Sequence, residues 1–517
     1  MAVMEPIMTR RPEITAAMHV NKNPVLTTPV LTTPVLKNPV LKNKAVWLAA
    51  VTAFLIEMAF SVRYGYVRDE LYFLAAGAHP AAGYVDQPSL TPLLAHLDAL
   101  VTGNTLIGLR ALPALGLAAL VLLAAAMARV LGAGGRGQLL AGIAAGCCGE
   151  YLGAMHELTT APLDFVAWAV ALYLVTRLLT SRDPRWWTAI GAAAGIGMSA
   201  KWNIGFLVAG LLLGFAGTPA ARPLLRGRYL AWGAAAFIVL AAPDFLWQAA
   251  HGWPNLAVFH TLQGDAWKNR VQYWPGQVLY TSILLVPLWL RGIRWALRHP
   301  LLRVIGIAAV FVIVVQFILG GKAYYPGGIY TFCFAAGAVS LEGLPWRRRA
   351  VTYIAAGAIS SLIALPVLPA AALARVPVQR VNYDLGEEIG WPSEVAALAA
   401  AWRALPQAER ERAILLAGNY GEAGAVDRYG TSFGLPQVYS GANSYWFWGP
   451  PPAADTVVVA INVDPALLHR EFAHVRQVAV YHNALNVADD EQGAVIDVAT
   501  GLRSSWTAAW PAFRNFS

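Results

Sequence analysis

The stretch ALPALGLAALVLLAAAMARVL at residues 111–131 carries a single charged side chain, Arg129. An apolar segment of this length can cross the roughly 30 Å hydrocarbon core of a bilayer as one helix. The same character extends along the chain, because 57% of its 517 residues are hydrophobic and only 13% are charged. A soluble domain is charged at about a quarter of its residues, so the excess apolar side chains are predicted to face lipid.

Further apolar blocks of about 15 to 22 residues, with almost no charge, follow one another along the chain. They predict roughly eleven spanning helices and therefore a multi-pass α-helical membrane protein. The expected spans are 45–61, 111–131, 139–155, 160–180, 187–200, 201–217, 229–246, 277–291, 301–319, 328–344 and 350–371.

The charges divide between alternate loops. One set carries Arg182 and Arg185, then Arg222, Arg226 and Arg228, then Arg291, Arg294, Arg298 and Arg303, then Arg347, Arg348 and Arg349. The intervening loops carry Asp69, Glu70, Asp86, Asp98, Glu150, Glu157 and Asp265. Because basic loops stay cytoplasmic, the N-terminus is predicted inside and the acidic loops and the C-terminal segment outside. Topology and anionic lipids account for the net charge of +9, so nucleic acid is not expected as a partner.

Three regions are expected. Residues 1–44 contain a repeat of NPVL and TTPVL units whose regularly spaced prolines forbid a helix, so a disordered cytoplasmic tail is predicted. Residues 45–371 form the membrane domain, and the first span is expected to act as an uncleaved anchor. Residues 372–517 are predicted to form a small extracytoplasmic α/β domain, with strands at 413–420, 456–463 and 477–484 and a helix at 393–404.

The loop that joins the first two spans, VRYGYVRDELYFLAAGAHPAAGYVDQPSLTPLLAHLD at 62–98, is too long for a simple connector. Long loops tend to carry function. Its adjacent acids Asp69 and Glu70 follow the first span at the water boundary. A catalytic role and a plain helix-capping or solvated role both stay open on composition alone.

The run RDELYFLAAGAHPAAGYVDQPSLTPLLA resembles the first outer loop of family-39 glycosyltransferases, which have the GT-C architecture. That family includes the dolichyl- and polyprenyl-phosphate-mannose protein mannosyltransferases and the aminoarabinose transferase that modifies lipid A. The resemblance implies that Asp69, with Glu70 beside it, is the catalytic carboxylate. The family's Tyr-x-acid-Lys/His-Pro-Pro signature corresponds to Tyr84 and Asp86, but Gln87 replaces its cation and Ser89 its second proline.

The resemblance continues more loosely through about residue 345. HELTTAPLDFVAWAVALYLV at 156–175 is similar to a family stretch that supplies an acid, here Asp164. GIGMSAKWNIGFL at 195–207 resembles a glycine-rich helix that ends in a lysine, here Lys201. GKAYYPGGIYTFCFAAGAV at 321–339 resembles a segment with a lysine and tyrosines, here Lys322, Tyr324 and Tyr325.

A sugar linked to polyprenyl phosphate carries its own leaving group, so its transfer needs chiefly a base for the acceptor hydroxyl and cations for the phosphate. Asp69 is the candidate base. Donor-phosphate contacts are predicted for Lys201, Lys322, Tyr324, Tyr84 and Arg270. The alternatives are snorkelling for the lysines and an interfacial aromatic belt for the tyrosines. The resemblance also implies inversion of the anomeric centre.

A second set of polar residues is predicted to bind the acceptor or to orient loops: Asp86, Asp164, His156 and Glu157. His156 has no second histidine at helical spacing, so no metal ligands are assigned, and no cofactor is expected. A divalent metal stays open. The cysteines Cys147, Cys148 and Cys333 lie in apolar spans and show no metal-binding spacing.

Two other classes of protein share some of these features. A transporter or lipid flippase would also have many spans, but it should show an internal repeat, and none is visible. A non-catalytic scaffold would not need acids clustered in one long loop. The sequence therefore predicts a glycosyltransferase of the bacterial inner membrane that takes a sugar from a polyprenyl-phosphate donor. Lipid, protein and glycan all stay open as the acceptor, and membrane lipids surround the chain.

Overall fold

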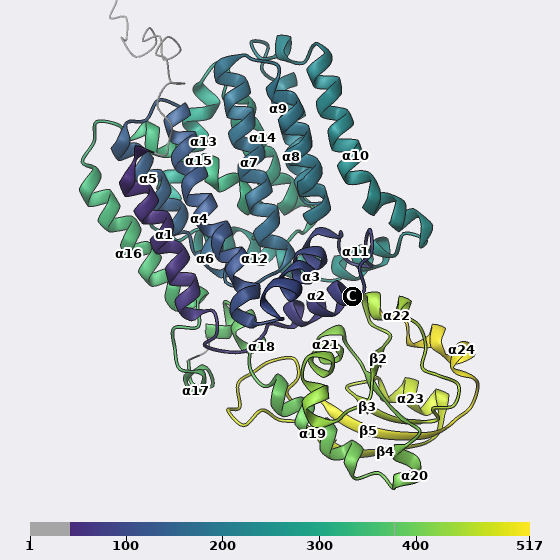
Figure 1. Cartoon of the computed structure of the whole chain (residues 1–517). Helices are drawn as coiled ribbons and strands as arrows, with labels where there is room; N and C mark the ends of the chain where they lie inside the picture. The colour runs from purple at the N-terminus through teal and green to yellow at the C-terminus, as the bar shows by residue number, and fades with distance from the viewer. Residues whose placement is uncertain (1–41, 377, 517) are drawn as a thin grey trace, which may run out of the picture. The chain divides into compact units, whose positions relative to one another are not determined.

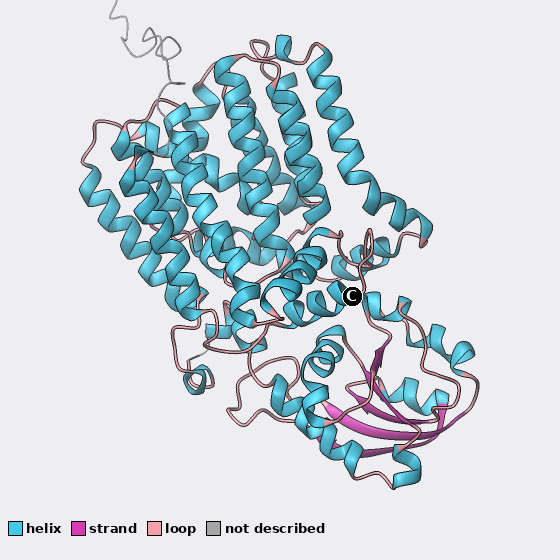
Figure 2. Ribbon diagram, viewed as in Figure 1, coloured by secondary structure: helices cyan, strands magenta, loops and turns pink. Residues whose placement is uncertain are grey.

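A computed structural model describes residues 42–376 and 378–516 (Figure 1). The tail predicted at 1–44 therefore lies, except for its last three residues, outside the described residues. Helices make up the chain as far as Arg410, and strands occur only beyond that point (Figure 2).

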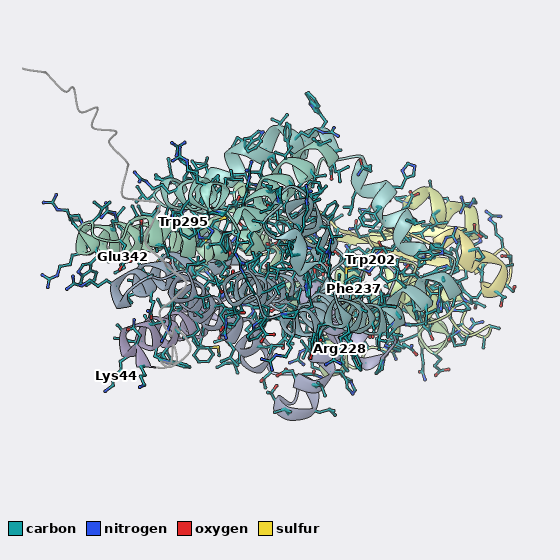
Figure 3. The ribbon with its side chains drawn as sticks, turned by 90° about the horizontal axis from the view of Figure 1, so that it is seen from above. Lys44, Trp202, Arg228, Phe237, Trp295 and Glu342 are labelled. Carbon is teal, nitrogen blue, oxygen red and sulfur yellow. The ribbon has the colours of Figure 1, made fainter. Side chains whose placement is uncertain are left out.

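The helical part begins with α1 (Lys44–Phe60), after which α2 (Arg68–Ala78) and α3 (Leu90–Thr102) lie in and beyond the first outer loop. The next helices are α4 (Leu106–Val130), α5 (Gly135–Gly146), α6 (Gly149–Ala154), α7 (Thr160–Ser181), α8 (Trp186–Ala200), α9 (Ile204–Ala216) and α10 (Arg228–Ala250). They are followed by α11 (Pro254–Gln263), α12 (Ala266–Tyr280), α13 (Val286–Arg298), α14 (Arg303–Leu319), α15 (Tyr330–Ser340), α16 (Trp346–Ala364), α17 (Ala370–Leu373) and α18 (Asp384–Glu387). Figure 3 turns the molecule to look along the helices and labels Lys44 and Arg228, the first residues of α1 and α10.

Within the described part, three helices are both long and apolar enough to cross a membrane: α4, α7 and α10. Shorter apolar helices cover Leu90–Thr102, Ile204–Ala216, Arg303–Leu319 and Gly327–Ser340. The prediction of a multi-pass helical membrane protein is confirmed at this level. The figure of roughly eleven spans stays a prediction.

Two predicted spans are not single helices. The span expected at 277–291 contains the end of α12 at Tyr280 and the start of α13 at Val286. Pro287 lies in the first turn of α13, where a missing amide is harmless, so it favours a helix start inside an apolar window. The span expected at 139–155 divides into α5 and α6 at Cys147 and Cys148. The predicted division at Lys201 is observed, because α8 ends at Ala200 and α9 begins at Ile204.

The C-terminal domain contains a five-stranded sheet with the order β2-β1-β3-β5-β4. Its strands are β1 (Ala413–Ala417), β2 (Val438–Ser440), β3 (Val457–Ile461), β4 (Phe472–Val480) and β5 (Val495–Leu502). β1 pairs in parallel with β2 and β3, whereas β5 is antiparallel to β3 and β4. The helices around the sheet are α19 (Trp391–Arg403), α20 (Gln407–Arg410), α21 (Tyr420–Tyr429), α22 (Asn443–Phe447), α23 (Pro465–Glu471) and α24 (Trp506–Ala509).

The strand predictions were partly right. The runs at 413–420 and 456–463 contain β1 and β3, and the helix predicted at 393–404 is α19. The strand expected at 477–484 is wrong in extent, because β4 begins at Phe472 and ends at Val480. The polar residues that alternate along β4 reflect its position at the edge of the sheet, where much of the strand is exposed. β2 and β5 were not predicted.

One face of the sheet shares a hydrophobic core with the first outer loop. Leu71 and Tyr72 from α2 are buried in the same cluster as Leu415 from β1 and Val459 from β3. The opposite face packs on Trp506, Trp510 and Phe513 near the C-terminus. The outer loop and the C-terminal domain therefore form one packed unit, and this unit holds Asp69 in place.

Candidate active site

A cavity of about 840 Å³ lies where the first outer loop, the α6–α7 connection, α12, the segment after α14 and the segment around α18 meet. The charged and polar side chains that line it include Asp69, Glu157, Lys268, Lys322, Tyr324 and Asp384. Four of these residues were named as site residues from the sequence. Acids and cations thus share one compartment large enough for a sugar phosphate.

Asp69 occupies the first turn of α2, where the unpaired amides and the helix dipole favour a negative charge. α2 starts at this point because the carboxylate of Glu70 accepts a hydrogen bond from the backbone N–H of Val67 at 3.0 Å. The hydroxyl of Tyr420, from the C-terminal domain, donates to Oδ1 of Asp69 at 3.1 Å. Asp69 is therefore held at the cavity from two directions.

Glu70 does not face this cavity. It is completely buried and receives Nε and Nη2 of Arg110 at 3.0 and 2.8 Å. The same guanidinium donates to the carbonyl oxygens of Ser61 and Gly65 at 3.0 and 2.9 Å. Arg110 thus ties the end of α1, the start of α2 and α4 together, and Glu70 serves as its main counter-charge.

The predicted cations lie at different depths. Lys322 lines the cavity, in the segment between α14 and α15. Nζ of Lys201 lies behind the cavity wall, 5.0 Å from the ring centroids of both Tyr324 and Tyr325. Arg270 instead donates to the carbonyl oxygen of Ile318 at 2.9 Å, on the outer side of α12. Lys268, two residues earlier on α12, is the side chain that lines the cavity.

Asp164 contacts the cavity wall around Tyr324 and Tyr325 indirectly, through the side chain of Asn203. Its Oδ2 accepts from the amide of Asn203 at 2.8 Å, and its Oδ1 accepts from the indole of Trp168 at 2.8 Å. Asn203 also donates to the carbonyl oxygen of Tyr325 at 2.8 Å. Asp164 is therefore connected through Asn203 to the segment that carries Lys322 and Tyr324, and its predicted role stays a prediction.

Glu157 and Asp384 form an acid pair on the cavity wall. Burial raises the pKa of Glu157 well above its usual range, and the neighbouring Asp384 adds to the effect. Burial and then Asp69 raise the pKa of Asp384, while Lys322 opposes them. A side-chain hydrogen bond from Glu157 favours the ionised form of Asp384.

Tyr84 and Asp86 organise the outer loop rather than the cavity. The hydroxyl of Tyr84 donates within the loop, 3.0 Å from the carbonyl oxygen of Ala76. Asp86 accepts from Tyr72 at 2.8 Å, and burial raises the pKa of its carboxyl group to about 7. The hydroxyl of Ser444 lies 2.8 Å from that of Tyr72 and links the loop to the C-terminal domain.

The aromatic segment at 434–451 rests on the same loop, because Trp448 stacks on His79 with a centroid distance of 4.0 Å.

His156 belongs to the buried network around Arg110, with its Nε2 3.1 Å from Nη1 of the arginine. Its Nδ1 lies 3.4 Å from a carboxylate oxygen of Glu57. Across the described residues, no group of three or more His, Cys, Asp and Glu side chains is arranged to hold a metal ion. The expectation that no cofactor is needed stays a prediction.

Sequence reasoning missed three residues of this arrangement, Arg110, Asp384 and Tyr420, and it preferred Arg270 over Lys268 within the same outer loop. Arg110 had a usable signal, because it lies at an outer helix end where the charge pattern favours acids. Asp384 also had one, since acids return to the chain soon after the last predicted span. Tyr420 had no such sequence signal, because it is 351 positions from Asp69 in the chain and approaches it only in the folded protein.

Residues 86–247 match the model of a family described as dolichyl-phosphate-mannose-protein mannosyltransferase. The matched segment includes Asp86, Asp164 and Lys201, whereas Asp69 and Lys322 lie outside it. No curated protein matches the chain.

The fold is similar to that of solved structures. One is the crystal structure of ArnT from Cupriavidus metallidurans bound to undecaprenyl phosphate, with a TM-score of 0.56, 16% identity, and coverage of 87% of this chain and 97% of that one. The apo state of the same protein gives a TM-score of 0.56 at 15% identity, with the same coverage. The arabinofuranosyltransferase AftD from Mycobacteria has a TM-score of 0.46 at 14% identity, covering 89% of this chain and 42% of that one.

The family model and the fold confirm the resemblance that the outer loop indicated. Over residues 86–247 the chain resembles the protein mannosyltransferase family, and its fold resembles that of ArnT. A transporter or scaffold finds no support among these matches.

Proposed function

We propose that the chain transfers a sugar from a polyprenyl-phosphate donor to an acceptor on the outer face of the membrane, with Asp69 as general base. The observation that carries the proposal is the cavity itself, which gathers Asp69, Lys268, Lys322 and Tyr324 in one compartment. A carboxylate beside cations fits a displacement in which a hydroxyl loses a proton while a phosphate departs.

The reaction is a single displacement. The acceptor oxygen forms a bond to the anomeric carbon and gives its proton to Asp69, while the bond from that carbon to the phosphate oxygen breaks. The polyprenyl phosphate leaves as an anion toward Lys322 and Lys268, and the hydroxyl of Tyr324 can donate to it. One displacement inverts the anomeric centre.

α12 supports a donor that comes from the bilayer. Trp267, Val271 and Trp274 are exposed on its outer side, with Trp267 75% exposed, as expected for side chains that face lipid. Lys268 and Gln272 of the same helix line the cavity. This helix therefore separates an apolar surface from a charged compartment, which suits a substrate with a lipid tail and a phosphate head. The crystal structure of ArnT with undecaprenyl phosphate shows a protein of similar fold with a ligand of this class.

The remaining predicted residues take supporting roles in the proposal. Asp164 and Lys201 hold the segment of Lys322 and Tyr324 from behind. Glu70 keeps α2 in place through Arg110, so Asp69 alone is assigned as the base. The Tyr84 hydroxyl and the Arg270 guanidinium donate hydrogen bonds to backbone carbonyl groups away from the cavity. Neither residue is therefore assigned to the sugar-donor site.

We place the protein in a bacterial inner membrane, with the N-terminus cytoplasmic and residues 372–517 on the outer face. The alternating basic loops support this orientation. Hydroxyl groups of lipid, protein or glycan are the acceptor classes to be tested.

The test is turnover of a panel of polyprenyl-phosphate sugars by the full chain in proteoliposomes. We expect release of polyprenyl phosphate by the parent chain and a loss of about 10²- to 10⁴-fold in Asp69→Asn. Asp183→Asn is the matched control, because this acid is paired with Arg185 in a loop of the predicted cytoplasmic side. If no donor is consumed, or if both variants are equally active, the proposal is wrong. Movement of intact donor across the bilayer would instead favour a transporter.

A further inference from the structure

The segment NYGEAGAVDRYG at 419–430 forms the start and the body of α21, and its first turn is fixed locally. The side chain of Asn419 accepts from the backbone N–H groups of Gly421 and Glu422 at 2.8 and 2.9 Å. The carboxylate of Glu422 in turn accepts from the backbone N–H of Asn419 at 3.0 Å. This reciprocal capping box sets the direction of Tyr420, the first residue of the helix.

α21 approaches α2 closely because two glycines lie on its contact face. A Cβ atom at Gly424 would lie 2.8 Å from the backbone carbonyl carbon of Leu71 and 2.9 Å from its oxygen. A Cβ atom at Gly421 would lie 2.4 Å from Cγ of Arg68. Glycines three residues apart share one face of a helix, so both permit the same contact. A side chain at position 424 would push α21 away from the backbone of α2.

The close contact places Tyr420 on Asp69. Besides its 3.1 Å hydrogen bond to Oδ1, the Tyr420 ring packs 4.9 Å from the ring of Tyr72. Cζ of Arg68 lies 5.8 Å from the centroid of the same ring. Arg68 is itself anchored to Asp490 at 3.1 Å and to Glu387 at 3.5 Å. Tyr420 is therefore packed from several sides, and its hydroxyl is directed at one oxygen of the carboxylate.

We propose that Tyr420 is a positioning residue of the C-terminal domain that orients the Asp69 carboxylate for proton transfer. The inference rests on the proposed function. By holding Oδ1, the Tyr420 hydroxyl leaves Oδ2 to take the proton of the acceptor. A misplacement of about 1 Å can cost about 10²-fold in rate, so one hydrogen bond at this point matters. The C-terminal domain is thus part of the catalytic machinery.

The experiment compares the parent chain with Tyr420→Phe, which keeps the ring and removes only the hydroxyl. We expect kcat to fall by about 10- to 100-fold with KM for the donor within about twofold. Tyr439→Phe is the control, because Tyr439 lies on β2 and contacts Gln437. In an Asp69→Asn background, Tyr420→Phe should cause no further loss.

Gly424→Ala provides a second variant that retains the hydroxyl but displaces the helix, and it should also lower kcat. An unchanged kcat for Tyr420→Phe, or a full additional loss in the Asp69→Asn background, would overturn the inference. If the parent enzyme still depended on Asp69, the proposed function would remain intact. No turnover by the parent chain would overturn the proposed function, and the inference with it.

Discussion

Replacement of Arg110 by methionine is expected to destabilise the protein by about 3–5 kcal/mol, the cost of breaking a buried ion pair from one side. The guanidinium is 1% exposed and its bonds to Glu70, Ser61 and Gly65 measure between 2.8 and 3.0 Å. Methionine fills much of the volume but supplies no donor, so Glu70 and two carbonyl oxygens lose their main partner. Because Glu70 and Asp69 share the first turn of α2, donor turnover should fall as well.

The loss should depend on pH. Burial raises the pKa of Glu388 to about 8, and Arg110, which lies 3.5 Å away, opposes that rise. A buried acid of this kind stabilises the fold when protonated, and that stability is lost as the pH rises through its folded pKa. Without Arg110, Glu388 should remain protonated to still higher pH. The difference in free energy of unfolding between the parent chain and Arg110→Met should therefore be largest above pH 8, where Glu388 of the parent is ionised beside Arg110, and should narrow as the pH falls through about 8.

The assay is thermal unfolding in detergent followed by tryptophan fluorescence, with Arg270→Met as the matched control. Arg270 is an outer-side arginine whose guanidinium bonds only the carbonyl oxygen of Ile318 among the described residues, so its loss should cost at most about 1 kcal/mol. Equal apparent Tm values for the two variants, or a gap that does not change with pH, would refute the reasoning about the buried network.

Three further outcomes follow from the site. Lys322→Met should raise KM for the donor by about 10- to 100-fold, because a charge-assisted hydrogen bond to phosphate is worth about 1.5–3 kcal/mol. A KM within about threefold of the parent value would exclude Lys322 from the donor site. Glu157→Gln should keep near-parent stability, because an amide N–H can still donate to Asp384, whereas Glu157→Ala should lower Tm. Equal Tm values for Glu157→Gln and Glu157→Ala would exclude the interaction between Glu157 and Asp384. Asp86 has a pKa near 7 that is raised by burial, so its contribution to stability is lost as the pH rises through 7. Asp86→Asn cannot ionise and should show a smaller fall in Tm between about pH 6 and pH 8, and an unchanged fall would contradict the assignment.

The sequence predicted the class of fold because lipid imposes a simple rule on length and polarity. α4 and α7 are recognisable from their apolar residues alone. The rule fails where an apolar window runs through a helix boundary, as at Pro287, because hydropathy does not register helix ends. β5 was missed for a related reason. Its sequence VIDVATGL includes Asp497 and Thr500, and its pairing with β3 depends on tertiary contacts.

The site was predictable where one segment carried a recognisable motif, as for Asp69, Lys322 and Tyr324. It was not predictable where packing decides which face of a helix looks inward. Arg270 was preferred over Lys268, but residues two apart on a helix point to different sides, and the structure turns Lys268 to the cavity. Asp384 reaches the cavity, and Tyr420 reaches Asp69, only after the segment beyond the last span folds back onto α2.

The central claim is that Asp69 removes the acceptor proton in a single displacement from a polyprenyl-phosphate sugar. Its most direct test measures donor binding and transfer separately in Asp69→Asn, with the anomeric configuration of the parent enzyme's product determined by NMR. We expect the variant to bind donor with a Kd within a few-fold of the parent value and to transfer sugar about 10²- to 10⁴-fold more slowly, while the parent product shows an inverted anomeric centre. Transfer by the variant at the parent rate, or retention of configuration in the parent product, would contradict the account.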